Sequence, residues 1–206
     1  MIGLFRRFYF LDRWRDTLIS AIIIAIPFII WDAMVTDKHW MFNSQYTLNF
    51  HIAHLPIGEW LFFLTVPSAC LFSWEMIVKR SDGSPIMIGK IVRYVVFVLP
   101  ITGVWLYING TEYTGLVLMA ISLAVLLDMY FKTDLLFQKR FYLYLALIIL
   151  FTFIFNGYLT WRPVVLYGET YQLGIRIFTI PIEDFGYGIA LMFLCTIVYE
   201  KIKMKK

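Results

Sequence analysis

The sequence predicts an all-α membrane protein, a polytopic transmembrane helical bundle with about six spans. Of its 206 residues, 61% are hydrophobic and only 16% are charged, whereas in a soluble domain about half are apolar and roughly a quarter are charged. This composition excludes large soluble enzymes, secreted disulfide scaffolds and nucleic-acid binders. Six apolar stretches are long enough to cross a bilayer. They occupy residues 17–35, 56–77, 87–108, 114–131, 141–157 and 181–200.

The first stretch follows basic residues, as a signal peptide would, but it is long, contains Pro27 and Asp32, and offers no small-residue cleavage site. We therefore expect a retained helix. Pro67 and Pro100 lie within later spans, where neighbouring helices can satisfy the freed backbone carbonyls. The two cysteines, Cys70 and Cys195, both lie inside apolar runs, which favours packing over a disulfide or a metal site.

The basic residues predict the orientation. Fifteen of the 18 Lys and Arg precede the first span, follow the last, or lie in or beside the gaps after the second and fourth spans. Only Lys38, Arg162 and Arg176 fall in the alternate loops. By the positive-inside rule, the N- and C-termini are cytoplasmic, and the two long loops, 36–55 and 158–180, face outward.

An internal duplication is visible at an offset of 125 residues. This offset places Leu55-Pro-Ile-Gly-Glu59 on Ile180-Pro-Ile-Glu-Asp184 and Cys70 on Cys195. Four spans separate equivalent points, so the two copies have parallel orientations.

The predicted organisation is a first repeat at 1–80, a connecting segment with the third span at 81–113, and a second repeat at 114–206. Upstream, with one residue of slippage, Asp32 falls on Asn156 and Met1 falls opposite Val125, so we expect the first repeat to have no counterpart of the span 114–131. We expect either a shorter architecture or a start site further upstream.

Four carboxyl groups lie near the outer ends of the spans: Asp32, Glu59, Glu183 and Asp184. An ionisable group in a span costs ~2.5–3.5 kcal/mol on insertion scales and is a functional candidate by default. An acid in a first helical turn also stabilises the helix N-terminus, and for any one of these residues both explanations hold equally well. Their clustering in both repeats favours function, because an acid among apolar groups keeps its proton and can act as a general acid.

Aromatic residues surround these acids. Their ring faces can stabilise a cation, although aromatic residues also anchor helices at membrane interfaces. Acids with an aromatic lining suit proton-initiated chemistry on an apolar polyene. The candidate substrate-binding residues are Trp31, Trp40, Trp60, Phe63, Asn156, Tyr158, Trp161, Phe185 and Tyr187.

Four sequence blocks together contain these acids and their neighbours. They are Phe28-Ile-Ile-Trp-Asp32, Leu55-Pro-Ile-Gly-Glu-Trp-Leu-Phe-Phe63, Asn156-Gly-Tyr-Leu-Thr-Trp-Arg-Pro-Val-Val165 and Ile180-Pro-Ile-Glu-Asp-Phe-Gly-Tyr-Gly188. These blocks resemble the membrane-integral lycopene cyclases, which occur as heterodimers in some bacteria and as fusions in archaea, fungi and other bacteria. The resemblance covers residues 8–203.

This resemblance implies a cofactor-independent cyclisation of the linear ψ end groups of lycopene to β-rings. The expected partners are a lipid-soluble carotenoid and the lipids of a prokaryotic cytoplasmic membrane, without nucleic acid, and a homo-oligomer is left open. Glu183 is the leading acid, with Asp184 and Glu59 as partners and Asp32 as a second carboxylate. Glu183→Gln is then expected to abolish ring formation. The first repeat departs from the family pattern, because Gly58 stands where an acid is usual.

Two other functions stay open at this point. A proton-coupled transporter or proton-conducting protein also fits a duplicated bundle with intramembrane acids, and a cyclase of longer-chain carotenoids fits the same motifs. Weaker signals are His51-x-x-His54, which could bind a metal if it lay on a helix, and the arginines Arg162 and Arg176, which could pair with the acids.

Overall fold

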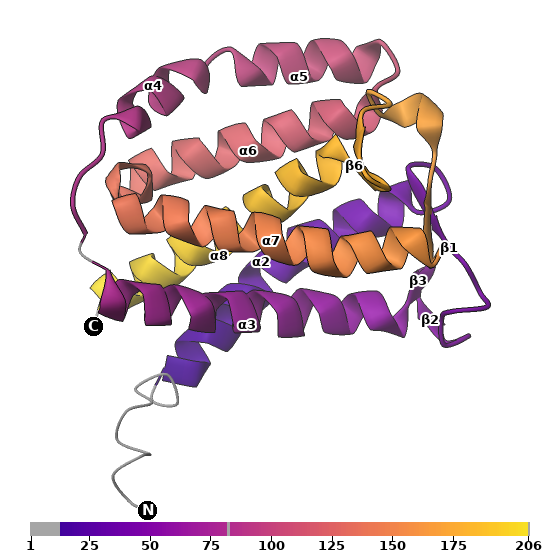
Figure 1. The fold of residues 1–206 in the computed structure, drawn as a ribbon, viewed down its shortest axis with the longest axis horizontal. Coiled ribbons are helices and arrows are strands. Elements are labelled where there is room, and N and C mark those ends of the chain that lie inside the picture. The colour runs from indigo at the N-terminus through magenta and orange to yellow at the C-terminus, as the bar shows by residue number, and fades with distance from the viewer. Residues whose placement is uncertain (1–12, 82, 206) are drawn as a thin grey trace, which may run out of the picture.

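The long helices run side by side along one bundle (Figure 1). The computed structural model describes residues 13–81 and 83–205, so Arg6, Arg7 and Lys206, which entered the orientation prediction, lie outside the described residues. Five helices are long and apolar enough to cross a membrane, which confirms the all-α bundle. They are α2 (Trp14–Val35), α3 (Ile57–Arg80), α6 (Glu112–Phe131), α7 (Lys139–Trp161) and α8 (Ile182–Met204).

The predicted third span is not one continuous helix. It is divided into α4 (Ile88–Val95) and α5 (Leu99–Ile108), which meet at an angle of 43°. Pro100 in the first turn of α5 explains the break, because proline has no N–H to donate and disfavours a helical conformation in the residue before it. The bundle has six spans if this bent pair counts as one.

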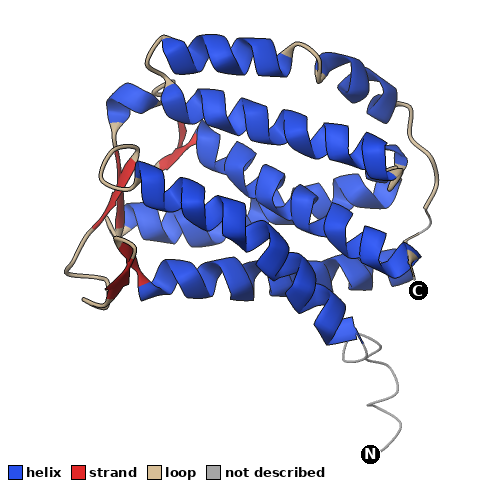
Figure 2. Cartoon of the chain, turned by 180° about the vertical axis from the view of Figure 1, so that it is seen from behind, coloured by secondary structure: helices blue, strands red, loops and turns tan. Residues whose placement is uncertain are grey.

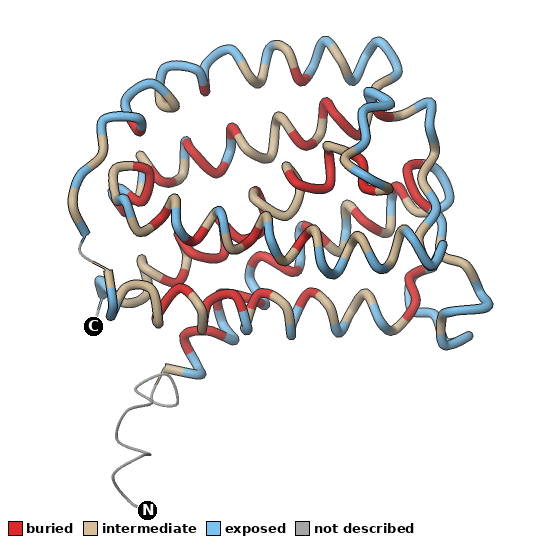
Figure 3. The backbone as a smooth tube through the Cα atoms, in the orientation of Figure 1, coloured by how far each residue is buried: buried red, intermediate tan, exposed pale blue. Residues whose placement is uncertain are grey.

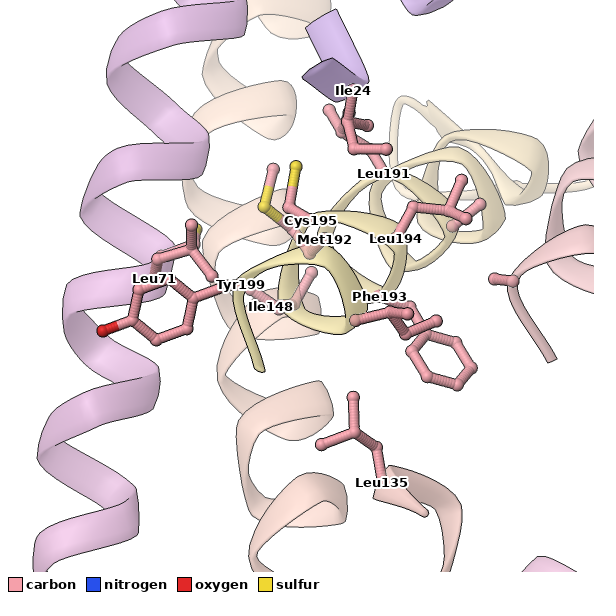
Figure 4. Close-up of a cluster of buried hydrophobic side chains, with 14 of the residues drawn as sticks. Ile24, Leu71, Leu135, Ile148, Leu191, Met192, Phe193, Leu194, Cys195 and Tyr199 are labelled. Carbon is pink, nitrogen blue, oxygen red and sulfur yellow. The ribbon is translucent and has the colours of Figure 1, made fainter. Parts of the chain in front are cut away.

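Helix α8 forms the centre of the bundle and packs against α2, α3, α6 and α7. Within its spanning window 67% of the residues are buried, against 17% in α7, and Figure 3 shows buried segments along these central helices. A helix that is surrounded on all sides needs apolar residues on all sides. Figure 4 shows Leu191, Met192 and Cys195 of α8 within this core.

Three short antiparallel strand pairs gather at one end of the bundle (Figure 2), which we name the hairpin end. Strand β1 (Trp40–Phe42) pairs with β4 (Val165–Tyr167), β2 (His51–Ile52) with β3 (Leu55–Pro56), and β5 (Arg176–Ile177) with β6 (Ile180–Pro181). Two 3₁₀ turns, η2 (Leu135–Phe137) and η3 (Glu169–Tyr171), complete the fold. His51 and His54 therefore lie in a hairpin and not on a helix, which removes the spacing argument for a metal site.

The two local hairpins have the same register at an offset of 125 residues. His51 lies opposite Pro56 in one, and Arg176 lies opposite Pro181 in the other. Both prolines directly precede a helix, with φ values of −56° and −57°. In the pair β1–β4, Met41 lies opposite Leu166, again 125 residues apart, as expected if a two-fold axis passed between them. These geometries support the duplication, while the repeat boundaries stay a prediction.

At the opposite end of the bundle, Glu75 and Glu200 lie near the ends of their spans, where solvated side chains are the ordinary expectation, but both are paired. Lys203 Nζ lies 2.5 Å from Glu75 Oε1 and 2.9 Å from Glu200 Oε1. Trp74 Nε1 also donates to Glu200, at 2.8 Å. This partly buried network joins α3 to α8, and hence one predicted repeat to the other.

Candidate active site

An apolar cavity of about 320 Å³ lies between α2, α3, α7 and α8, near the hairpin end. Three of the four predicted acids line it, namely Asp32, Glu59 and Asp184. The other lining residues are mostly aromatic or aliphatic. They are Trp40, Phe42, Phe62, Phe63, Val66, Cys70, Tyr113, Ile148, Phe151, Thr152, Phe155, Asn156, Tyr158, Leu159, Val165, Tyr167, Tyr187, Gly188, Leu191 and Met192.

Asp184, in the first turn of α8, accepts hydrogen bonds from three side chains. The Tyr113 hydroxyl donates to Oδ1 at 2.8 Å, Asn156 Nδ2 donates to Oδ2 at 3.1 Å, and the Tyr167 hydroxyl also donates to Oδ2. Donors that converge on a carboxyl group favour its ionised form, which is purely an acceptor.

Tyr167 lies in β4, where the pairing with β1 fixes its backbone. Burial and the neighbouring Asp184 raise the pKa of the Tyr167 phenol well above its ordinary value, so this hydroxyl keeps its proton and acts as a donor.

Asp32, in the last turn of α2, has one strong partner. Trp40 Nε1 donates to Asp32 Oδ1 at 2.6 Å, and the strand pair β1–β4 holds this tryptophan in place. Asp32 and Asn156 correspond at an offset of 124 residues, one fewer than in the rest of the repeat. They share one local contact, because Thr36 and Thr160, each four residues further on, donate their hydroxyls to the backbone carbonyls of these residues.

Glu59 differs from both of these acids. It lies in the first turn of α3 and lines the cavity, yet no side chain or backbone group in the described part of the chain donates a hydrogen bond to its carboxyl group. Asp32 is close enough to interact with it electrostatically. An unpartnered carboxyl group that faces apolar walls and a second acid is more stable in the neutral form.

Glu183 points away from the cavity, although it precedes Asp184 in the chain. Its Oε1 accepts hydrogen bonds from Thr114 Oγ1 at 2.6 Å and from the Leu173 backbone N–H at 2.8 Å, while Oε2 is buried without a partner. Glu183 thus joins α8 to the start of α6 and to the loop after β4.

The position of Glu183 gives a physical reason for the unusual Gly58. At the offset of 125 residues, Gly58 is the counterpart of Glu183 and Glu59 is the counterpart of Asp184. A Cβ atom at Gly58 would meet nothing within 4 Å. Within the described residues, no helix stands beside Gly58 as α6 stands beside Glu183. The acid that is missing from the first repeat would thus lie outside the cavity.

Five of the nine predicted substrate-binding residues line the cavity: Trp40, Phe63, Asn156, Tyr158 and Tyr187. The other four do not. Trp31 packs against Tyr187 with the rings tilted and their centroids 5.0 Å apart, and Phe185 packs edge-on against Phe153 at 4.9 Å. Trp60 donates to the Ile52 carbonyl at 3.1 Å, and Trp161 is exposed.

Sequence reasoning missed Tyr113 and Tyr167, the two phenols that bind Asp184. Tyr113 lies at the start of α6, and subtracting 125 from its number gives no residue of the sequence, so the repeat pattern could not point to it. Tyr167 is the counterpart of Phe42 at the offset of 125 residues, and this pairing of two aromatic residues was its one available signal. Neither Arg162 nor Arg176 contacts an acid of the cavity; the Arg176 side chain donates to the Thr179 carbonyl.

The fold and the cavity define a class of protein, a polytopic membrane protein with three carboxyl groups in an apolar, aromatic-lined site. The family model for lycopene cyclase matches residues 1–77 and 110–202, which is most of the chain. The protein belongs to the lycopene cyclase family and is a carotenoid cyclase. Neither a curated protein nor a solved structure matches the chain. The two matched segments end 125 residues apart, and the bent pair α4–α5 lies in the unmatched segment between them.

Proposed function

We propose that the protein is a lycopene β-cyclase, which converts the linear ψ end groups of lycopene to the β-rings of γ- and β-carotene. One observation carries the proposal: in a member of this family, three carboxyl groups from both predicted repeats converge on one apolar cavity. The reaction is an isomerisation, so it consumes no proton and no electron overall.

The hydrogen bonds favour a division of labour between the two equivalent acids. Glu59, which has no donor, is the general acid and protonates the C1=C2 double bond at C2. The resulting tertiary cation at C1 is attacked by the C5=C6 double bond, which forms the C1–C6 bond and moves the charge to C5. Asp184, which accepts three hydrogen bonds, removes the proton from C6 and leaves the ring double bond between C5 and C6.

The cavity wall supplies the electrostatic stabilisation that this sequence of cations needs. The aromatic side chains of Trp40, Phe63 and Tyr187 line the same cavity as the acids, and an aromatic ring attracts a cation through its face. Asp32, which is held by Trp40, is the second carboxylate. Its charge stabilises the neutral form of Glu59 before the reaction and the carbocation after proton transfer.

Pigment analysis tests this proposal. A lycopene-accumulating host that expresses the chain is expected to form γ- and β-carotene, measured by HPLC. Because positioned proton transfer contributes about 10²–10⁴-fold to a rate, Glu59→Gln and Asp184→Asn should each reduce ring formation at least a hundredfold. Glu169→Gln, which changes an exposed acid of η3, should leave it unchanged. The absence of any cyclised product from the unaltered chain, or cyclisation of a longer carotenoid alone, would contradict the proposal.

The basic residues support an orientation in which both termini face the cytoplasm of a prokaryotic cell and the hairpin end faces outward. The acids then lie near the outer boundary of the membrane.

A further inference from the structure

We propose that the cavity opens sideways into the bilayer through the seam between α3 and α7, and that it admits one end group while the rest of the polyene stays in lipid. This inference rests on the proposed function, because it concerns how a cyclase of a long carotenoid receives its substrate. The position of the acids alone gives neither the route by which the substrate enters nor the order in which its two ends are cyclised.

The exposed part of the cavity wall lies on α7. Phe155 is 60% exposed and Tyr158 is 57% exposed, although both line the cavity. Across from them on α3, Phe62 and Val66 line the cavity and are half-buried. The two helices lie side by side in Figure 1. By contrast, the lining residues Asp184, Leu191 and Met192 of α8 are buried. The cavity therefore reaches the surface of the bundle along this seam.

The opening faces the hydrocarbon of the bilayer and not water. The lining residues of α7 nearest the opening run from Phe151 to Leu159, which is about 12 Å along a helix at 1.5 Å per residue. All of them lie within a helix long and apolar enough to span the membrane. An apolar polyene dissolved in the bilayer can reach this opening without contacting water, which would be unfavourable for it.

The counterpart of this seam lies between α2 and α8, because α8 corresponds to α3 and α2 to α7 at the offset of 125 residues. This second seam is closed. At the offset of 125 residues, Tyr187 of α8 corresponds to Phe62 of α3. Tyr187 packs against Trp31 and Phe28 of α2, with ring centroids 5.0 and 5.2 Å away. Behind it lies α6, so close that a Cβ atom on Gly186 would be 2.4 Å from Val117 Cγ1. Helix α6 thus seals one of two otherwise equivalent seams.

The size of the cavity limits what enters it. A volume of about 320 Å³ lies at the small end of the roughly 300–1,000 Å³ range of ligand pockets, which suits one end group in the cavity with the rest of the polyene in lipid. With a single portal, the second end group can enter only after the first ring has left. The monocyclic carotenoid must therefore be released before the bicyclic product forms.

Tryptophan substitutions at the seam test the portal. Val66→Trp on α3 and Phe155→Trp on α7 place a larger side chain in the opening, and each is expected to reduce lycopene cyclisation at least tenfold. The matched controls are Leu64→Trp and Ile154→Trp, which lie on the same two helices, are exposed, and do not line the cavity. Both controls should stay within twofold of the unaltered chain, with HPLC of extracted pigments normalised to the amount of folded protein in the membrane.

A time course with the unaltered chain tests the order of events without any substitution. With lycopene in excess, γ-carotene is expected to accumulate first and β-carotene to follow only as lycopene is consumed. Bicyclic product that appears without a monocyclic phase, or full activity in both seam variants, would overturn the inference while leaving the proposed cyclase intact. A chain that forms no cyclised carotenoid at all would instead overturn the proposed function.

Discussion

Hydrogen-bond donors distinguish the two equivalent acids at the level of single residues. Asp184 and Glu59 occupy matching positions in the first turns of α8 and α3. Of these two acids, only Asp184 accepts hydrogen bonds from two phenols and an amide. The counterpart of Tyr167 at the offset of 125 residues is Phe42, which has no hydroxyl to donate. A duplicated pair of residues can in this way acquire opposite protonation preferences from its neighbours alone.

Removal of one of the two phenol hydroxyls that bind Asp184 should weaken catalysis by this base and leave its carboxylate in place. A hydrogen bond to a charged group contributes about 1.5–3 kcal/mol, so Tyr167→Phe should lower the rate of ring formation about 10- to 100-fold. Tyr113→Phe should act in the same direction. The measurement is the initial rate of γ-carotene formation in isolated membranes.

Tyr130→Phe, which removes a hydroxyl from an exposed tyrosine of α6, is the matched control for both phenol variants. If all three variants have the same rate, the hydrogen bonds to Asp184 do not matter for the reaction.

Replacement of the carboxyl group by an amide should be tolerated at Glu183 but not at Glu59 or Asp184. A glutamine at position 183 keeps an oxygen that can accept from Thr114 and from the Leu173 N–H, whereas leucine keeps none and leaves both donors unpaired. We expect Glu183→Gln to retain at least a third of the cyclase activity and Glu183→Leu to lose most of it. Pigment HPLC on matched amounts of membrane protein measures both variants. An inactive Glu183→Gln would restore this residue to the acid role that the sequence suggested.

The sequence could identify the acids but not which of two neighbours reaches the cavity. Successive residues on an α-helix point about 100° apart, so one of two neighbouring acids can face the cavity while the other faces an adjacent helix, as Asp184 and Glu183 do. The choice depends on the side of α8 that α6 covers. No local sequence pattern encodes how α6 packs on α8. The one hint was Gly58, the counterpart of Glu183, which shows that the first repeat needs no acid at this position.

At the level of elements, hydropathy predicted the long helices well because each of them is apolar over its full length. It failed at residues 87–108, where an equally apolar stretch contains the break before Pro100. It also could not predict the pairing of β1 with β4, because strands 125 residues apart meet only when the helices that carry them have packed.

The close packing of α5 on α6 depends on two glycines. A Cβ atom at Gly115 would lie 2.5 Å from the Gly103 carbonyl oxygen and 2.8 Å from the Tyr107 backbone nitrogen. Small residues allow such close approach of helices in membranes. Gly115→Ala should therefore destabilise the protein by about 1–3 kcal/mol, a fall in Tm of about 2–12 °C for a chain of this size. Gly58→Ala, in open space on α3, is the control and should leave the Tm unchanged within error.

The loop between α2 and β1 should make stability depend on pH through His39. Burial is the main cause that lowers the pKa of this imidazole, and the positive charge of Lys38 lowers it further. Glu112, whose carboxylate lies 3.0 Å from Nε2, acts in the opposite direction and raises the pKa in part. Because the unfolded chain takes up a proton at a higher pH than the folded one, His39 contributes stability above about pH 6.5 that is lost as the pH falls below it. Thermal unfolding in detergent between pH 7.5 and 5 should show this loss, and His39→Gln should reduce it. An equal loss in both proteins would assign it to other groups.

On the scale of the whole molecule, the site belongs to neither predicted repeat alone. Asp32 and Glu59 come from the first and Asp184 from the second, and the β1–β4 pair that holds Trp40 and Tyr167 joins the two. At the other end of the bundle, Lys203 of α8 binds Glu75 of α3, and Trp74 of α3 binds Glu200 of α8. Helices α4 and α5 lie outside the family match and contribute no residue to the cavity.

A chain divided between α3 and α4 should therefore reassemble into an active cyclase. The fragments 1–83 and 84–206 separate Glu59 from Asp184 but leave the helix contacts of α3 with α7 and α8 to bring them together. Co-expression of both fragments in a lycopene-accumulating host should yield cyclised carotenoid, and either fragment alone should yield none. Glu59→Gln in the first fragment should abolish the activity of the pair, because the second fragment then supplies a base without an acid. Ring formation by the second fragment alone would mean that Asp184 can both deliver and remove the proton, and the shared site would have to be abandoned.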